Sequence, residues 1–399
     1  VINGVDRVQD GLFGVDGASG GNFDEQRAAN MHTASGSSAG LAEVAEDPNR
    51  PGQIDRKRLE AMLAKAKPEK PSLRIDNELH CLQGGPGWQT GPRVRNGYVI
   101  PHDLEVYGQW AEALVRHRLK TAPRTKHYFQ FFGEISLLGY WNVPESIQDP
   151  RRESSNRGGR RAAQRLIDVI KAADKAIRAG GHDVRLGTPG LTNALQWSNW
   201  RSWRSWWVPM IDQLGDKVSF YGVHWYDMTP DMLAIEAGIV QAAQHNRWKT
   251  RLPLCIQESD YTQGGMDDPR NGPYNAQYLW ALLEMPDKVV VNVSHVRDLG
   301  GTMFHNMFRA DRRLPKYWSY WVMGDLRGTM RDVRVSESVD RSAIPSRKRG
   351  GRLWLFRQDR GIRARAAGDG RRVSALVWND RMQGDRTTRI RFRLPPGVR

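Results

Sequence analysis

Residues 218–259 read VSFYGVHWYDMTPDMLAIEAGIVQAAQHNRWKTRLPLCIQES, and this stretch decides the fold. An apolar, strand-like run over 218–227 is followed by an amphipathic helix-like segment over 231–245. A second strand-like run over 252–259 then follows. Strand, helix and strand in this order predict neighbouring parallel strands joined by a helix.

The same alternation extends in both directions along the chain. Further strands are expected at 12–17, 72–82, 127–134, 183–190 and within 289–305, and further helices at 55–66, 104–119, 160–179 and 274–284. The stretch over 43–51 looks irregular. About eight strand–helix repeats over roughly 310 residues predict an α/β fold, the (β/α)8 TIM barrel, for residues 1–327. A doubly wound sheet is the alternative, although no glycine-rich phosphate turn follows the first strand.

The pattern changes in residues 328–399. Apolar and polar residues alternate over 352–380 and 387–395, with Gly and Asp turns between them. This is typical of an antiparallel β module of a sandwich-like kind. Because the sequence stops just after one such strand, an incomplete module is among our expectations.

Composition restricts the function only weakly. The net charge is +16, with 60 Lys and Arg against 44 Asp and Glu. Such a field favours polyanionic partners such as nucleic acids or sulfated glycans, or it reflects a genomic bias toward Arg. The two cysteines, Cys81 and Cys255, fall in predicted strands, and we expect two buried thiols rather than a disulfide or a metal pair.

Two glutamates close predicted strands. Glu134 ends FQFFGE (129–134), and Glu258 ends LPLCIQE (252–258). In a barrel, catalytic groups project from the C-terminal ends of strands. Cleavage of a glycosidic bond needs two carboxyl groups, and a separation of about 5 Å makes the second one a nucleophile with retention of configuration. We therefore assign Glu134 as acid/base and Glu258 as nucleophile; the alternative is that each forms a structural ion pair.

With these glutamates on the fourth and seventh strands, the sequence resembles the clan A retaining glycosidases. Within that clan, FFGEISLLGYW (131–141), KAIRAGGHDVRLGTPG (175–190), VSFYGVHWYD (218–227) and PLCIQESDY (253–261) resemble the β-agarase and β-porphyranase family, glycoside hydrolase family 86. The resemblance implies double-displacement cleavage within the chain of a β-linked red-algal galactan of the agarose or porphyran type, sulfated or not.

One position departs from the clan's pattern. Many clan A enzymes carry Asn immediately before the acid/base Glu, where this chain has Gly133. Either another side chain supplies the contact to the sugar 2-hydroxyl, or the acid lies elsewhere. Glu145, in YWNVPES (140–146), is the competitor.

Several other side chains are candidates for binding substrate. His224 and Tyr226 share a strand face, so that Tyr226 could donate to Glu258 and His224 to a sugar hydroxyl, unless they form a packed core pair. Trp200, Trp203 and Trp207 have helical spacing and are expected to pack on the barrel. The remaining candidates are Trp197 for stacking on a sugar ring, Trp88 and Arg93 in a long loop, His80, His305 and Asn306 near strand ends, and Tyr261 at the rim.

Neither a metal nor a cofactor is expected, since the sequence has no HExxH, no paired CxxC and no calcium-loop spacing. We expect a polysaccharide partner, no nucleic acid, no membrane, a monomer and a secreted or periplasmic protein. The alternatives left open are a clan A glycosidase acting on xylan, mannan or carrageenan, a nucleic-acid-binding protein, and a barrel that only binds glycans or polyanions.

Overall fold

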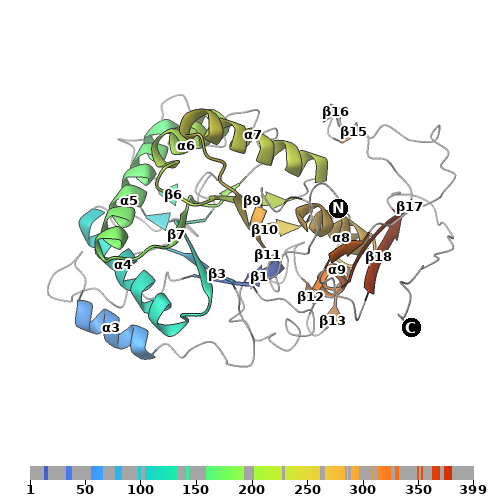
Figure 1. The fold of residues 1–399 in the computed structure, drawn as a ribbon, viewed down its shortest axis with the longest axis horizontal. Helices are drawn as coiled ribbons and strands as arrows, with labels where there is room; N and C mark the ends of the chain where they lie inside the picture. The colour runs from blue at the N-terminus through green and yellow to red at the C-terminus, as the bar shows by residue number, and fades with distance from the viewer. Residues whose placement is uncertain are drawn as a thin grey trace.

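A parallel sheet with helices along its outer side forms the centre of the molecule (Figure 1). The computed structural model describes residues 13–16, 33–37, 55–65, 77–82, 98–99, 104–133, 141–142, 159–192, 202–226, 230–260, 266–283, 285, 289–295, 307–309, 312–324, 329–331, 348–349, 352–353, 362–368 and 373–379. Among the helices in these ranges, none combines the length and the apolar character that crossing a membrane requires.

The sheet has nine strands, hydrogen-bonded in the order β7, β5, β3, β2, β1, β11, β10, β9 and β8. They are β1 (Phe13–Asp16), β2 (Thr33–Ser37), β3 (Asn77–Cys81), β5 (Lys126–Gln130), β7 (Arg185–Gly187), β8 (Leu191–Thr192), β9 (Tyr221–Tyr226), β10 (Leu254–Asp260) and β11 (Val289–His295). Every neighbouring pair is parallel. From β1 to β7 and again from β8 to β11, each strand of the sheet lies beside the sheet strand that precedes it in the chain, and β11 returns to β1. The strand order of a doubly wound sheet reverses at a switch point, and this order does not, so the doubly wound alternative was wrong.

The two ends of this order, β7 and β8, belong to one short segment of the chain. β7 pairs with β5, and β8 pairs with β9. Two isolated bridges add to these pairings: Gly187 of β7 bridges to Phe220, just before β9, and Gly190, just before β8, bridges to Gly133, which follows β5. The segment therefore has partners on both of its sides. Counted as one segment, β7 and β8 are the fifth of eight; β5 is then the fourth and β10 the seventh.

From β2 onward, helices separate the successive strand segments of the sheet along the chain, as predicted. They are α3 (Arg56–Lys65), α4 (Leu104–Thr121), α5 (Gly159–Ala179), α6 (Val208–Leu214) after a π-helical turn η3 (Trp203–Trp207), α7 (Pro230–Trp248), α8 (Asn271–Leu283) and α9 (Pro315–Gly324). From α4 to α9, each helix packs against the next. α5 ends as expected: Gly180 N donates to Ala176 O at 3.0 Å, and Gly181 has a φ of 77°, which glycine adopts readily.

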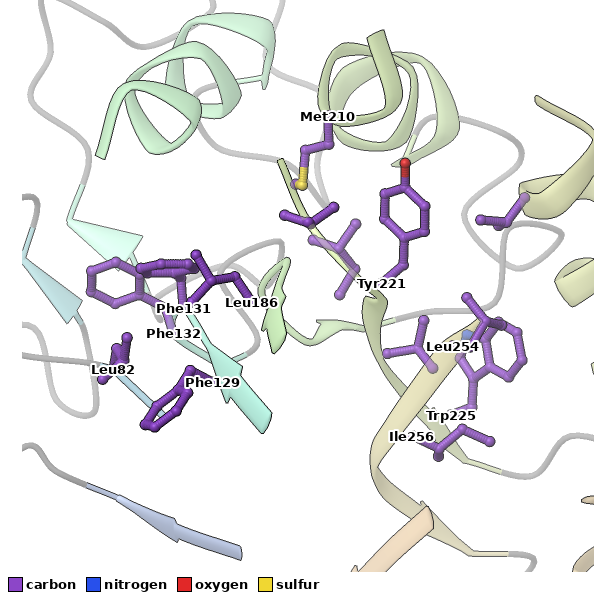
Figure 2. Packing of buried hydrophobic residues seen from close by; sticks show 14 of the residues in the cluster. Leu82, Phe129, Phe131, Phe132, Leu186, Met210, Tyr221, Trp225, Leu254 and Ile256 are labelled. Carbon is purple, nitrogen blue, oxygen red and sulfur yellow. The ribbon is translucent and has the colours of Figure 1, made fainter. Parts of the chain in front are cut away.

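Apolar side chains pack on both faces of the sheet. The main core lies between strands and helices, where Figure 2 shows Leu186, Tyr221 and Ile256 with Met210 of α6. A separate cluster consists of Leu79, Tyr128, Phe220 and Cys255. Because Phe129 belongs to the main core and successive strand residues point to opposite faces, Tyr128 and its cluster lie on the face away from the helices. We call it the inner face.

A thiol reagent is expected to label Cys81 and to spare Cys255 in the native protein. The two cysteines form no disulfide, as expected, and Cys255 is fully buried; Cys81 is partly exposed, so the expectation of a buried thiol was wrong for Cys81. Burial raises the pKa of the Cys255 thiol well above its usual range, and the thiolate is the reactive form. Titration with dithionitrobenzoate should therefore count one thiol in native buffer and two in denaturant. Equal native labelling of both would contradict this.

The remaining strands are antiparallel, apart from the parallel pair β4 (Tyr98–Val99) and β6 (Trp141–Asn142). After α9, β14 (Thr329–Arg331), β17 (Ile362–Gly368) and β18 (Val373–Asn379) form a three-stranded sheet. Two hairpins join β12 (Phe308–Arg309) to β13 (Arg312–Arg313) and β15 (Lys348–Arg349) to β16 (Arg352–Leu353). Ala367 and Leu376 of the three-stranded sheet belong to the main core. The boundary at residue 327 stays a prediction.

Candidate active site

An irregularity in β10 turns Glu258 toward the inner face. β10 pairs with β9 in step from Leu254 opposite Tyr221 to Ile256 opposite Val223, and the register then shifts so that Glu258 lies opposite His224. Cys255 belongs to the inner cluster, so strict alternation would place Gln257 inward and Glu258 outward. The extra residue in β10 acts as a β-bulge and brings Glu258 to the side of His224.

His224 and Glu258 form the centre of the candidate site. His224 Nδ1 lies 3.1 Å from Glu258 Oε2; the histidine side chain is 3% exposed and the glutamate side chain 23%. His224 Nε2 lies 3.0 Å from Gln257 Oε1. Both ring nitrogens thus face an oxygen, and a ring nitrogen donates to an oxygen only when it carries its hydrogen. A buried ring therefore contacts a carboxylate that is partly exposed to solvent.

Residues without a side chain make room for this arrangement. A Cβ added to Gly190 would lie 2.1 Å from His224 Nε2 and 2.1 Å from Gln257 Oε1. A Cβ on Gly222 would lie 2.4 Å from Gln257 Nε2. The hydroxyl of the buried Thr188 accepts a hydrogen bond from Gly222 N at 3.0 Å. Gly222 lets β9 approach the backbone at Thr188, whose carbonyl oxygen would lie 2.7 Å from an added Cβ, and Gly190 leaves room for the side chains of His224 and Gln257.

Glu134 lies outside the described residues, but the residue before it is placed. Gly133 is buried and bridges to Gly190, the glycine that touches His224 and Gln257. Gly133 follows the fourth strand segment, β5, by three residues, and Glu258 lies two residues before the end of the seventh, β10. The distance between the two carboxyl groups stays a prediction.

The structure locates only some of the other candidates. Tyr226 lies two residues beyond His224 on β9, and its backbone is opposite that of Asp260 on β10. That the side chain of Tyr226 shares a face with His224 stays a prediction. Trp207 is buried with its ring 5.9 Å from that of Tyr221, which confirms that this tryptophan packs on the sheet. Outside the described residues lie Trp88, Arg93, Glu145, Trp197, Tyr261, His305 and Asn306.

His80 does not join His224 and Glu258, and the expectation that it helps to wall the site has to be corrected. It follows Leu79, which is on the inner face, so its ring points toward the helices. There His80 Nε2 lies 2.9 Å from His127 Nδ1 and 3.3 Å from Glu78 Oε2. Burial lowers the pKa of His80. Burial acts to raise the pKa of Glu78, but the hydrogen bond from His80 and the charges of His80, Arg118 and His127 together lower it to about 2.

Sequence reasoning missed three residues of the candidate site: Thr188, Gly190 and Gln257. Gln257 is adjacent to Glu258, and with regular alternation the two would face opposite sides of the strand. No residue in LPLCIQES indicates the register shift that the structure shows in β10. Thr188 and Gly190 flank Pro189 at the end of a predicted strand. Because Pro and Gly interrupt regular strand pairing, this run could have indicated a break in the strand at that point.

Comparison of the fold with solved structures finds clan A glycoside hydrolases of families 39 and 86. A β-porphyranase of family 86 from the human gut bacterium Bacteroides plebeius has a TM-score of 0.57 and 12% identity, over 95% of this chain and 64% of that one. A family 86 enzyme in complex with neoagarooctaose has a TM-score of 0.62 and 12% identity, over 94% and 66%. A family 39 β-xylosidase from Caulobacter crescentus has a TM-score of 0.54 and 15% identity, over 92% and 78%.

At these identities the likeness shows the fold, and it confirms the expected resemblance to clan A. The chain spans 64% to 78% of the length of these three structures. No protein-family model matches the sequence, and no curated protein matches it.

Proposed function

We propose that this protein is a retaining glycoside hydrolase whose sheet closes into a (β/α)8 barrel, with Glu258 as the nucleophile and Glu134 as the acid/base. The observation that carries the proposal is the contact between the partly exposed Glu258 and the buried His224, at 3.1 Å, near the C-terminal end of the seventh strand segment. The clan A fold supports it, because in this fold the reacting groups stand at the C-terminal ends of strands. The bridge from Gly133 to Gly190 supports the placement of Glu134.

The chemistry of the proposal uses these groups in two displacements. Glu134 protonates the glycosidic oxygen while Glu258 attacks the anomeric carbon, which breaks the bond to the leaving sugar and forms a glycosyl ester. Glu134 then takes a proton from water, the water attacks the same carbon, and Glu258 leaves as a carboxylate. An N–H group of His224 stabilises the charged form of Glu258, which is the form that attacks and the form that leaves.

The substrate class in this proposal is a β-linked red-algal galactan of the agarose or porphyran type, cleaved within the chain. Two of the similar structures are a β-porphyranase and an enzyme bound to neoagarooctaose. The net charge of +16 favours a sulfated polymer. A β-xylosidase of family 39 is also similar in fold, so another β-glycan is the second candidate.

Release of reducing sugar from agarose, porphyran, carrageenan, xylan and mannan tests the function, with the anomers of the first products followed by proton NMR. Oligosaccharides from agarose or porphyran, with the β-anomer appearing first, are the expected result. Activity confined to another glycan would discard the galactan but keep the two glutamates. The α-anomer first would overturn retention. Tight binding of oligosaccharides without any release would leave a barrel that only binds glycan.

His224→Phe is expected to lower kcat about 100-fold, in the range seen when one charge-stabilising donor is removed, with a smaller change in KM. Phenylalanine keeps a ring in the buried position and loses the N–H group that faces Glu258. His182→Phe is the matched control, because His182 also faces a glutamate, Glu112, at 3.0 Å, but on helix α4 away from the inner face. Equal kcat values for the two variants would remove His224 from the mechanism.

A further inference from the structure

Three buried side chains come together between β3 and β5 on the helix-facing side of the sheet: Glu78, His80 and His127. Their nearest nitrogen and oxygen atoms are 2.9 Å apart for His80 Nε2 and His127 Nδ1, 3.3 Å for His80 Nε2 and Glu78 Oε2, and 3.5 Å for His127 Nδ1 and Glu78 Oε2. All three atoms therefore surround one point. The proposed glycosidase chemistry uses none of them.

These separations match the edges of a coordination tetrahedron. Zinc binds His nitrogen and carboxylate oxygen at about 2.0–2.2 Å, so two ligands of a tetrahedral ion lie roughly 3.4 Å apart. The three observed separations lie on either side of that value. Two His and one Glu, with a fourth position for water, are also a ligand set that zinc takes, chiefly at catalytic sites.

The surrounding groups orient the ligand atoms. His127 Nε2 lies 2.9 Å from Ala122 O and donates to it, which leaves the lone pair of Nδ1 directed at His80 and Glu78. The guanidinium of Arg118 lies 3.5 Å from Glu78 Oε1, whereas both histidines approach Oε2. One carboxylate oxygen thus faces the arginine, and the other faces the histidines.

We propose that Glu78, His80 and His127 bind a zinc ion that fastens β3 to β5. Zinc replaces the proton shared by the two histidines, and each side chain supplies one bond. The described His, Cys, Asp and Glu side chains supply three ligands, and the proposal assigns the fourth position to a water molecule. Because the group faces the helices, the ion is structural, and its loss lowers stability rather than changing the substrate.

Zinc content and thermal stability of the full chain test the site. Protein stripped with a strong chelator and reloaded with zinc chloride is expected to hold one equivalent by mass spectrometry, and its Tm should rise with free zinc. Cobalt chloride should give the intense visible bands of tetrahedral Co²⁺. Wild-type protein that retains no zinc, shows no zinc-dependent Tm and gives no such bands would overturn the proposal without reference to catalysis.

Glu78→Gln and His127→Gln locate the ion. Loss of an outer partner alone commonly weakens metal binding 10- to 100-fold, so loss of a ligand should cost at least about 100-fold. His182→Gln is the control, because it alters another His–Glu pair and should keep the full zinc equivalent. Zinc held equally by all variants would overturn the assignment. If a ligand variant does not fold, the presence or absence of the cobalt bands in the wild-type protein still tests whether the metal site exists.

Discussion

Glu258→Gln is expected to lower kcat on the polysaccharide substrate by at least about 10,000-fold, as removal of a covalent nucleophile does in other hydrolases. The amide has nearly the shape of the carboxylate but cannot form the glycosyl ester. Glu258 lies two residues before the end of β10 with 23% of its side chain exposed, so the change should leave the packing of the sheet intact. Turnover on the galactan that proves active, with oligosaccharide binding measured by calorimetry, checks both halves of this expectation.

Two comparisons make this result specific. Glu112→Gln alters a carboxylate that also contacts a histidine, outside the candidate site, and should leave kcat unchanged. Glu258→Ala opens a space in which azide can replace the carboxylate, and attack from that side on a β-linked substrate yields an α-glycosyl azide. Full activity of Glu258→Gln, or a β-azide from Glu258→Ala, would show that another group is the nucleophile.

Gly190→Ala is expected to lower the free energy of unfolding by about 1–3 kcal/mol, the usual effect of overpacking, and kcat/KM by about 100-fold. The new methyl group would lie 2.1 Å from His224 Nε2 and from Gln257 Oε1, so one of these two side chains has to move. Both are buried, and His224 cannot move without changing its contact with Glu258. Urea unfolding and steady-state kinetics measure the two effects.

Gly238→Ala is the matched control for this substitution. Gly238 lies within α7, and a Cβ added there meets no atom within 4 Å. Alanine is a better helix former than glycine, so this variant should gain about 0.5–1 kcal/mol and keep full activity. If Gly190→Ala matched Gly238→Ala in stability and rate, the close approach at Gly190 would not matter to the site.

Much of the fold follows from hydrophobic periodicity. The strand β9 lies inside the range predicted from VSFYGVHWYD, and β5 and β10 each extend one residue beyond the ranges predicted from HYFQFFGE and LPLCIQES. All three were found because each carries apolar residues that pack against helices or on the inner face. β2 was missed, since TASGS has small and polar residues and no apolar alternation. Tertiary pairing with β1 and β3 forms that strand where local preference does not.

The candidate site was predictable only in part, and the reason is local geometry. Glu258 and His224 stand at strand ends that a pattern can find, and the structure brings them into contact. Their contact depends on a register shift in β10, which arises from pairing with β9 and not from the residues of β10 alone. The group of Glu78, His80 and His127 joins residues 47 positions apart, so no spacing in the sequence could indicate it.

Ala367 and Leu376 have a consequence for any shortened form of the protein. They lie on β17 and β18, yet they are part of the hydrophobic cluster that also holds the sheet and its helices, and β18 contacts α8. A chain that stops at residue 327 would turn that portion of the cluster toward water. We therefore expect such a fragment to aggregate during expression, because the three-stranded sheet covers apolar surface of the main core.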